Sequence, residues 1–172
     1  DVGSTQAQDC CCFGKVPLPT PAFDTSTWVG SEYTPWRASN TLWWANFSDY
    51  KDDVSRELEI LRRVLGFTTL RVFLHNHVWN LNSTALLQNM ETFLGMCADT
   101  DIRVGFVFFD DCWNHTADLS KPCVPRKGVH NGCWVASPQD SQRNNGIGQF
   151  KDYVATIVNK FRADNRIAWW EV

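Results

Sequence analysis

Short runs rich in hydrophobic residues alternate along the chain with segments in which hydrophobic residues recur every three or four positions. The runs are rich in β-branched and aromatic residues, which predicts strands. They cover residues 27–33, 67–74, 102–109 and 166–172. The three- and four-residue spacing between the runs is typical of helices with one buried face.

Three helices are predicted from this spacing. The first covers residues 49–65 and ends at Gly66, with acidic residues near its start and arginines near its end, as the helix dipole favours. The second covers about 83–98, with Ser83 or Thr84 as its cap. The residues expected to face the core are Val54, Leu58, Leu61 and Leu65 in the first helix, Leu86, Met90, Phe93 and Cys97 in the second, and Phe150, Val154, Ile157 and Phe161 in the third.

A helix between each pair of strands predicts an α/β fold with a parallel sheet. The connections after strands are long, at 34–48, 75–82 and 110–148, whereas those after helices are short. Because ligands of parallel folds bind at the carboxyl ends of the strands, we expect the functional site there. Residues 110–148 exceed the ~12–15 residues of an ordinary loop and are rich in Trp, His, Asp and Cys, so we interpret them as an ordered, functional loop.

Composition narrows the functional class. The 172 residues are enough for one domain, and the net charge of −3 argues against nucleic acid as a partner. No run approaches the ~18 apolar residues of a membrane span. The sequence lacks the glycine-rich phosphate loop of nucleotide-binding folds and the Gly-x-Ser-x-Gly motif of serine hydrolases.

Glycosylation motifs and cysteines together indicate a secreted, extracellular protein. Asn-x-Ser/Thr motifs place candidate N-glycosylation sites at Asn46, Asn82 and Asn114. The chain also has 7 cysteines, which suits an oxidising compartment. No signal peptide is visible at the start, so we interpret the chain as a mature product.

The first three cysteines, Cys10, Cys11 and Cys12, are adjacent and cannot easily bond to one another. We expect them to reach separate partners or another chain. They lie in residues 1–25, whose prolines predict an extended Cys/Pro-rich arm. The odd total leaves at least one cysteine unpaired within this chain.

The cysteines of the long loop have two interpretations. Cys112, Cys123 and Cys133, with His130, could bind zinc, but they lack the closely spaced pairs of structural zinc sites. A disulfide among the three is favoured by the glycosylation motifs. We therefore expect no metal and no cofactor. Cys97, on the apolar helix face, is predicted to be a buried thiol.

Residues at the predicted strand ends suit a carbohydrate ligand. Flat indole rings can cover the apolar faces of sugar rings, and polar side chains can fix the hydroxyl groups. The candidate tryptophans are Trp36, Trp43, Trp44, Trp113 and Trp134, and the candidate polar residues are Arg71, His75, Asn76, His77, Asp110, Asp111 and His130. Packing in the core or in a loop is the alternative for each tryptophan.

The charged candidates have alternatives of their own. Asp110 and Asp111 could form a carboxylate pair for acid/base catalysis, but adjacent side chains point in different directions, so at most one faces the site. Arg71 lies inside an apolar strand, where an arginine needs a partner. A structural ion pair would serve, and a carboxylate at the centre of the fold is the expected partner.

Five segments carry a family resemblance. They are Thr27–Pro35, Leu65–His75, Gly105–Trp113, Gly128–Trp134 and Ile167–Val172. Together they resemble the amino-terminal half of a (β/α)₈-barrel glycoside hydrolase. The resemblance covers about residues 27–172 and points to the clan of retaining enzymes that includes cellulases, mannanases and β-glycosidases, most closely to a bacterial-type group labelled 1,4-β-xylanase or cellulase-like.

The resemblance implies that residues 26–172 are the first four β/α units of a TIM barrel and belong to an enzyme that cleaves β-linked polysaccharide or oligosaccharide with retention. It implies that Arg71 supports the catalytic nucleophile. Trp170-Glu171-Val172 matches only the start of a motif whose later glutamate is the acid/base, so Glu171 would be structural. Both catalytic carboxyl groups would then lie outside these residues. The chain alone is expected to be inactive and to need the missing half barrel, or another chain, over its open edge.

Two alternatives remain open. The chain could be a non-catalytic extracellular glycoprotein built on a degenerate barrel, serving as a structural or carbohydrate-binding component of an assembly. It could also be a free-standing four-stranded open sheet that binds a small ligand. The polypeptide encoded after Val172 distinguishes these from the enzyme.

Overall fold

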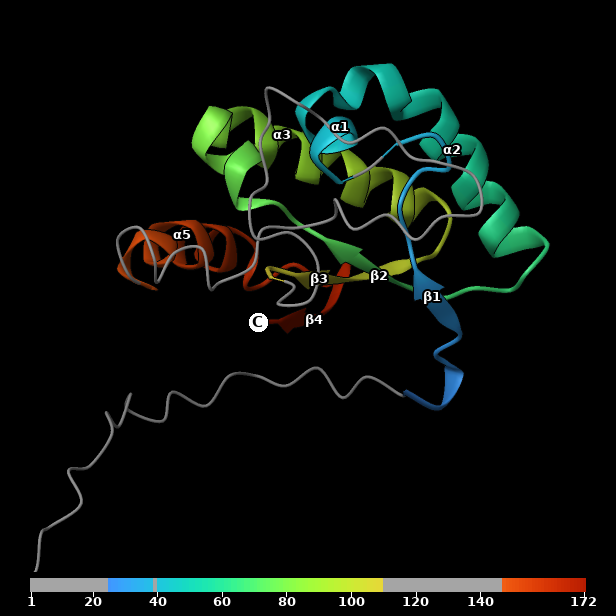
Figure 1. The fold of residues 1–172 in the computed structure, drawn as a ribbon. Helices are drawn as coiled ribbons and strands as arrows, with labels where there is room; N and C mark the ends of the chain where they lie inside the picture. The colour runs from blue at the N-terminus through green and yellow to red at the C-terminus, as the bar shows by residue number, and fades with distance from the viewer. Residues whose placement is uncertain (1–24, 39, 110–146) are drawn as a thin grey trace, which may run out of the picture.

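The computed structural model of the chain describes residues 25–38, 40–109 and 147–172. Four strands form one parallel sheet in the order β1-β2-β3-β4 (Figure 1). The strands are β1 (Gly30–Glu32), β2 (Thr69–Phe73), β3 (Arg103–Val107) and β4 (Ile167–Glu171). The predicted α/β class with a parallel sheet is confirmed, and the sheet is compatible with half of a β/α barrel. The arm predicted at 1–25 lies, except for its last residue, outside the described residues.

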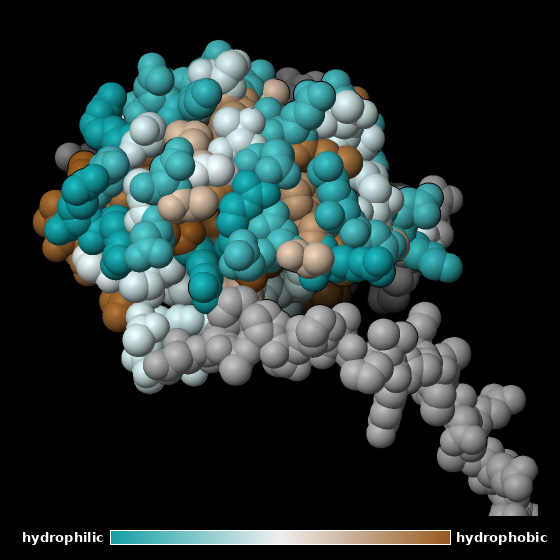
Figure 2. All heavy atoms as spheres, turned by 180° about the vertical axis from the view of Figure 1, so that it is seen from behind, coloured by the Kyte–Doolittle hydropathy of each residue, from teal (hydrophilic) through white to brown (hydrophobic). Residues whose placement is uncertain are grey.

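The described helices cover one face of the sheet (Figure 1). They are the α-helices α1 (Asn40–Ala45), α2 (Phe47–Arg63), α3 (Asn76–Asp99) and α5 (Lys151–Phe161), with short 3₁₀ turns at Thr25–Thr27 and Ile147–Phe150. Seen from behind, the surface is mainly hydrophilic, with hydrophobic side chains exposed in places, as expected of helices with one buried face (Figure 2). Within the described part of the chain, none of the helices is long and apolar enough to cross a membrane.

The core lies between the sheet and these helices. It contains Val54, Leu58, Leu86, Met90, Phe93, Cys97, Ile157 and Phe161 from the predicted helix faces. Leu65 is an exception, with 54% of its surface exposed, because α2 ends at Arg63 and Leu65 lies in the turn after it. Gly66 then adopts a φ of 71°, the left-handed conformation that a glycine readily supplies where a helix stops.

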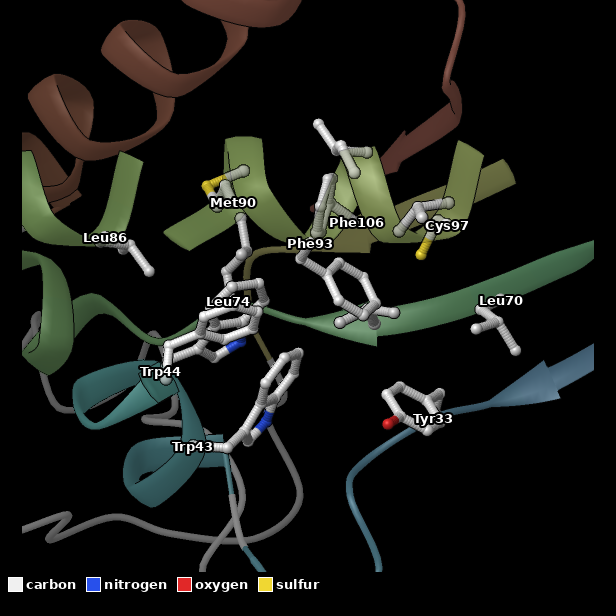
Figure 3. Close-up of a cluster of buried hydrophobic side chains, with 14 of the residues drawn as sticks. Tyr33, Trp43, Trp44, Leu70, Leu74, Leu86, Met90, Phe93, Cys97 and Phe106 are labelled. Atoms are coloured by element: carbon white, nitrogen blue, oxygen red, sulfur yellow. The ribbon is translucent and has the colours of Figure 1, made fainter. Parts of the chain in front are cut away.

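Residues 40–45 form helix α1, although the sequence pattern predicts a loop there. Trp43 and Trp44 of this helix are fully buried, so they belong to the core and are not ligand platforms. Figure 3 shows both indoles packed in the cluster that includes Met90 and Phe93 of α3. The Trp44 indole also donates a hydrogen bond to the carbonyl of Phe73, 2.8 Å away. Six residues are too few to show a helical period, and burial of the two rings fixes this helix instead.

Helix α3 begins at Asn76, so the loop predicted at 75–82 is wrong. The His75 side chain caps it, because Nδ1 accepts a hydrogen bond from the backbone N–H of His77 at 3.2 Å. A kink at Asn82 divides the helix. There Oδ1 of Asn82 accepts from the N–H of Ala85 at 3.0 Å, so Asn82 caps the second segment in place of the predicted Ser83 or Thr84.

The pairing of β4 with β3 contains an irregularity. The pairs on either side of it are Val104 with Ile167 and Gly105 with Trp169. Ala168 is therefore an extra residue on β4, a β-bulge. Because side chains alternate along a strand, the bulge turns Trp169 and Glu171 away from the helices and Trp170 toward them. The Trp170 ring stacks on Phe106 in the core, with 5.7 Å between ring centroids.

Candidate functional site

A charged cluster lies on the face of the sheet opposite the helices. Arg71 donates from Nε to Oε2 of Glu171 at 2.9 Å and from Nη2 to Oε1 at 2.5 Å. Its Nη1 donates to Oε2 of Glu32 at 3.2 Å. The three side chains are 33–40% exposed. The expectation that Arg71 pairs with a carboxylate is therefore confirmed, and its partners come from β1 and β4.

Gly105 explains how Arg71 reaches across the sheet. It pairs with Arg71 on one side and with Trp169 on the other, and it places no side chain between β2 and β4. The Trp169 indole occupies this space, because a Cβ atom on Gly105 would lie 1.9 Å from the ring. Trp28 then stacks on Trp169 with 5.3 Å between ring centroids and 27° between planes. The cluster thus has an aromatic wall beside its charges.

The electrostatics of the cluster fix the ionisation of Glu171. The pKa of this carboxyl group is lowered mainly by its hydrogen bonds from Arg71. Partial burial raises the pKa, but charge attraction to Arg71 and a hydrogen bond from the Trp169 side chain lower it further. A carboxylate held ionised, with both oxygens occupied, is a poor general acid at neutral pH. The arrangement suits a side chain that orients Arg71.

His75 and Asn76, predicted to contact substrate, are both buried at the end of β2. Burial, with His77 nearby, lowers the pKa of His75 to about 3, so its ring is neutral. Since neither side chain is exposed, the structure does not bring them to the surface beside Trp36, which is 73% exposed.

Tyr153 of α5 is a buried polar residue that the sequence analysis missed. Its ring packs against Phe108 and Phe109, and burial raises the pKa of its hydroxyl. Its spacing from Ile157 and Phe161 in steps of four could have placed it on the buried stripe. Among the described residues, the Tyr153 hydroxyl, Nε2 of His75 and Oδ1 of Asn76 have no hydrogen-bond partner.

Some of the other predicted residues lie within the described part of the chain, and the rest lie outside it. Cys97 is a buried free thiol, as predicted, and burial raises its pKa. Asn46 and Asn82 are exposed. The described residues contain no group of three or more His, Cys, Asp or Glu side chains placed to hold a metal ion. The predicted residues that lie outside the described ones are Cys10, Cys11, Cys12, Asp110, Asp111, Cys112, Trp113, Asn114, Cys123, His130, Cys133 and Trp134.

Comparison with known proteins found no relative of this chain. The chain matches no protein-family model, and no curated protein or solved structure is significantly similar to it. The structure itself defines an α/β protein with a four-stranded parallel sheet. Any closer assignment rests on the motifs of the sequence and on the charged cluster.

Proposed function

We propose that the chain is the amino-terminal half of a secreted retaining β-glycoside hydrolase, whose other half barrel is supplied by polypeptide outside these residues. The observation that carries this proposal is the position of Arg71. It lies on the second strand, on the face that a closed barrel would turn inward, and it is oriented there by Glu32 and Glu171. A motif resemblance that implies an arginine at this strand position supports the same assignment.

The proposed substrate is a β-linked polysaccharide or oligosaccharide. In this mechanism Arg71 orients a nucleophilic carboxylate, and Glu171 holds Arg71 without transferring a proton. Retaining hydrolysis needs two carboxyl groups about 5–5.5 Å apart, one as nucleophile and one as acid/base. Residues outside the chain would supply both.

The test compares the 172-residue chain with the chain extended by the polypeptide encoded after Val172. Both are incubated with β-glucan, β-mannan and β-xylan, and the anomer first released is identified by proton NMR. We expect the extended protein to hydrolyse one of these substrates with retention and the 172-residue chain to be inactive. Inactivity of the extended protein on all three, or a stop codon directly after Val172, would overturn the proposal in favour of a non-catalytic extracellular glycoprotein.

A further inference from the structure

Trp36 is an exposed tryptophan in the connection that follows β1. Its side chain is 73% exposed, whereas Trp43 and Trp44, a few residues later, are fully buried. The other tryptophans that the structure describes are at least partly buried. A large indole left in water is unusual for a residue that normally contributes to a core.

The backbone of Trp36 is attached to helix α2 through Glu57. The N–H of Trp36 donates to Oε1 of Glu57 at 3.1 Å, and the hydroxyl of Tyr33 donates to Oε2 at 2.7 Å. Tyr33 is itself buried, and its position is fixed by packing in the core. One carboxylate of α2 therefore holds the connection at two points, on and before Trp36.

The residue after Trp36 is attached to the same helix. Arg37 forms an ion pair with Asp53 and donates from Nη2 to the carbonyl of Asp49 at 2.9 Å. Its guanidinium carbon lies 4.9 Å from the centroid of the Tyr50 ring. Because Tyr33, the Trp36 N–H and Arg37 are all held by α2, little conformational freedom of the backbone remains to be lost when a ligand binds.

We propose that Trp36 is a preorganised platform for one pyranose ring of a β-linked glycan, with Glu57 as its positioning residue. The indole ring has an apolar face, and the exposed side chains of Arg37, next in sequence, and Arg56 share the buried Asp53 as their ion-pair partner. That combination fits the C–H face of a sugar and its hydroxyl groups. The inference rests on the proposed function, since it names part of the substrate site of that enzyme.

A protein-contact surface is the competing use of Trp36. Ile60 near the end of α2 and Val64 directly after the helix are 48% and 74% exposed, and an interface would use these apolar side chains together with the indole. The charged groups around Trp36 favour the sugar, because the centres of protein interfaces are depleted of charge. The two uses predict different behaviour of Trp36 and Val64 variants.

The test uses the 172-residue chain and hexaoses of β-1,4-linked glucose, mannose and xylose, with binding measured by titration calorimetry. Trp36→Ala should weaken binding of the recognised hexaose about tenfold, while Trp36→Phe should keep part of the affinity. Glu57→Ala should weaken binding severalfold, and Glu57→Gln, which can still accept from the N–H of Trp36, should restore most of it. Val64→Ala, at an equally exposed position directly after α2, is the matched control and should bind normally. Circular dichroism and thermal unfolding check that each variant is folded.

The outcomes separate this inference from the proposed function. If the wild type binds a hexaose and Trp36→Ala binds it equally well, the platform is wrong while the hydrolase proposal stands. If no hexaose binds the wild type, the platform is also wrong, and the activity of the extended protein decides the hydrolase proposal. If Trp36→Ala and Val64→Ala both change the sedimentation of the chain and neither changes hexaose binding, the surface is a protein interface.

Discussion

Arg71 separates two carboxylates, Glu32 and Glu171, that would repel each other without it. Its hydrogen bonds are the main cause of the lowered pKa of Glu171. Because the folded pKa lies below the ordinary value of 4.5, the pair stabilises the fold above that pH. This stabilisation is lost as the pH falls from 4.5 through the lowered value.

Replacing Arg71 with Met should reduce the free energy of unfolding at pH 7 by about 1 kcal/mol, a modest figure because the pair is partly exposed to solvent. It should also raise the pKa of Glu171 and weaken the loss of stability in acid. Urea unfolding at several pH values measures the first effect, and NMR titration of the carboxyl carbons measures the second. Arg162→Met, at an exposed position, is the control. A wild-type titration of Glu171 in Arg71→Met would contradict the assigned cause of its pKa.

At the scale of whole elements, the contact between β3 and β4 depends on a missing side chain. A Cβ atom on Gly105 would lie 1.9 Å from the Trp169 indole, which cannot move freely because Trp28 stacks on it. Gly105→Ala should therefore destabilise the fold by about 1–3 kcal/mol. It should also change the near-ultraviolet circular dichroism of the stacked rings.

Gly95 offers the matched control for this prediction. It lies inside α3, and a Cβ atom there would meet nothing within 4 Å. Gly95→Ala should stabilise the fold by about 0.5–1 kcal/mol, because alanine favours a helix interior. Equal effects of the two substitutions in thermal unfolding would show that steric contact with Trp169 does not govern Gly105.

Short apolar runs were sufficient to predict all four strands, and the three- and four-residue spacing was sufficient to predict the buried faces of three helices, apart from Leu65. Helix α1 was not predictable, since its six residues form a helix only once Trp43 and Trp44 are buried. The bulge at Ala168 was equally hidden, because the run from Ile167 to Val172 shows no alternation that marks its two faces. The need of Arg71 for a carboxylate was evident from the sequence, but the bulge is what turns Glu171 to the face where Arg71 also meets Glu32.

For the whole molecule, secretion can be tested through its glycosylation motifs. Asn46 and Asn82 are both exposed, so an N-glycan attached at either position would not disturb the core. Expressed in a eukaryotic secretory host, the chain should carry N-glycans that increase its apparent mass on gels. Asn46→Gln and Asn82→Gln should each remove the mass shift caused by one glycan. Treatment with an N-glycosidase should abolish the remaining glycan-dependent mass shifts. A secreted product whose mobility is unchanged by the glycosidase would contradict the assignment as a glycoprotein.

The sheet has two open edges among the described residues, because β1 pairs only with β2 and β4 only with β3 (Figure 1). Unpaired edges are templates for further strand pairing, and a closed barrel would remove them. We therefore expect the purified 172-residue chain to self-associate as its concentration rises, as measured by sedimentation velocity.

A charged edge should suppress this association. Ser31 is exposed on β1, and Ser31→Lys would place an ammonium group where a neighbouring strand has to approach. Gln88→Lys on the exposed surface of α3 adds the same charge away from the edge and should leave association unchanged. A wild-type chain that stays monomeric at all concentrations would contradict an open sheet in solution. If Ser31→Lys and Gln88→Lys weaken association equally, net charge and not the β1 edge governs it.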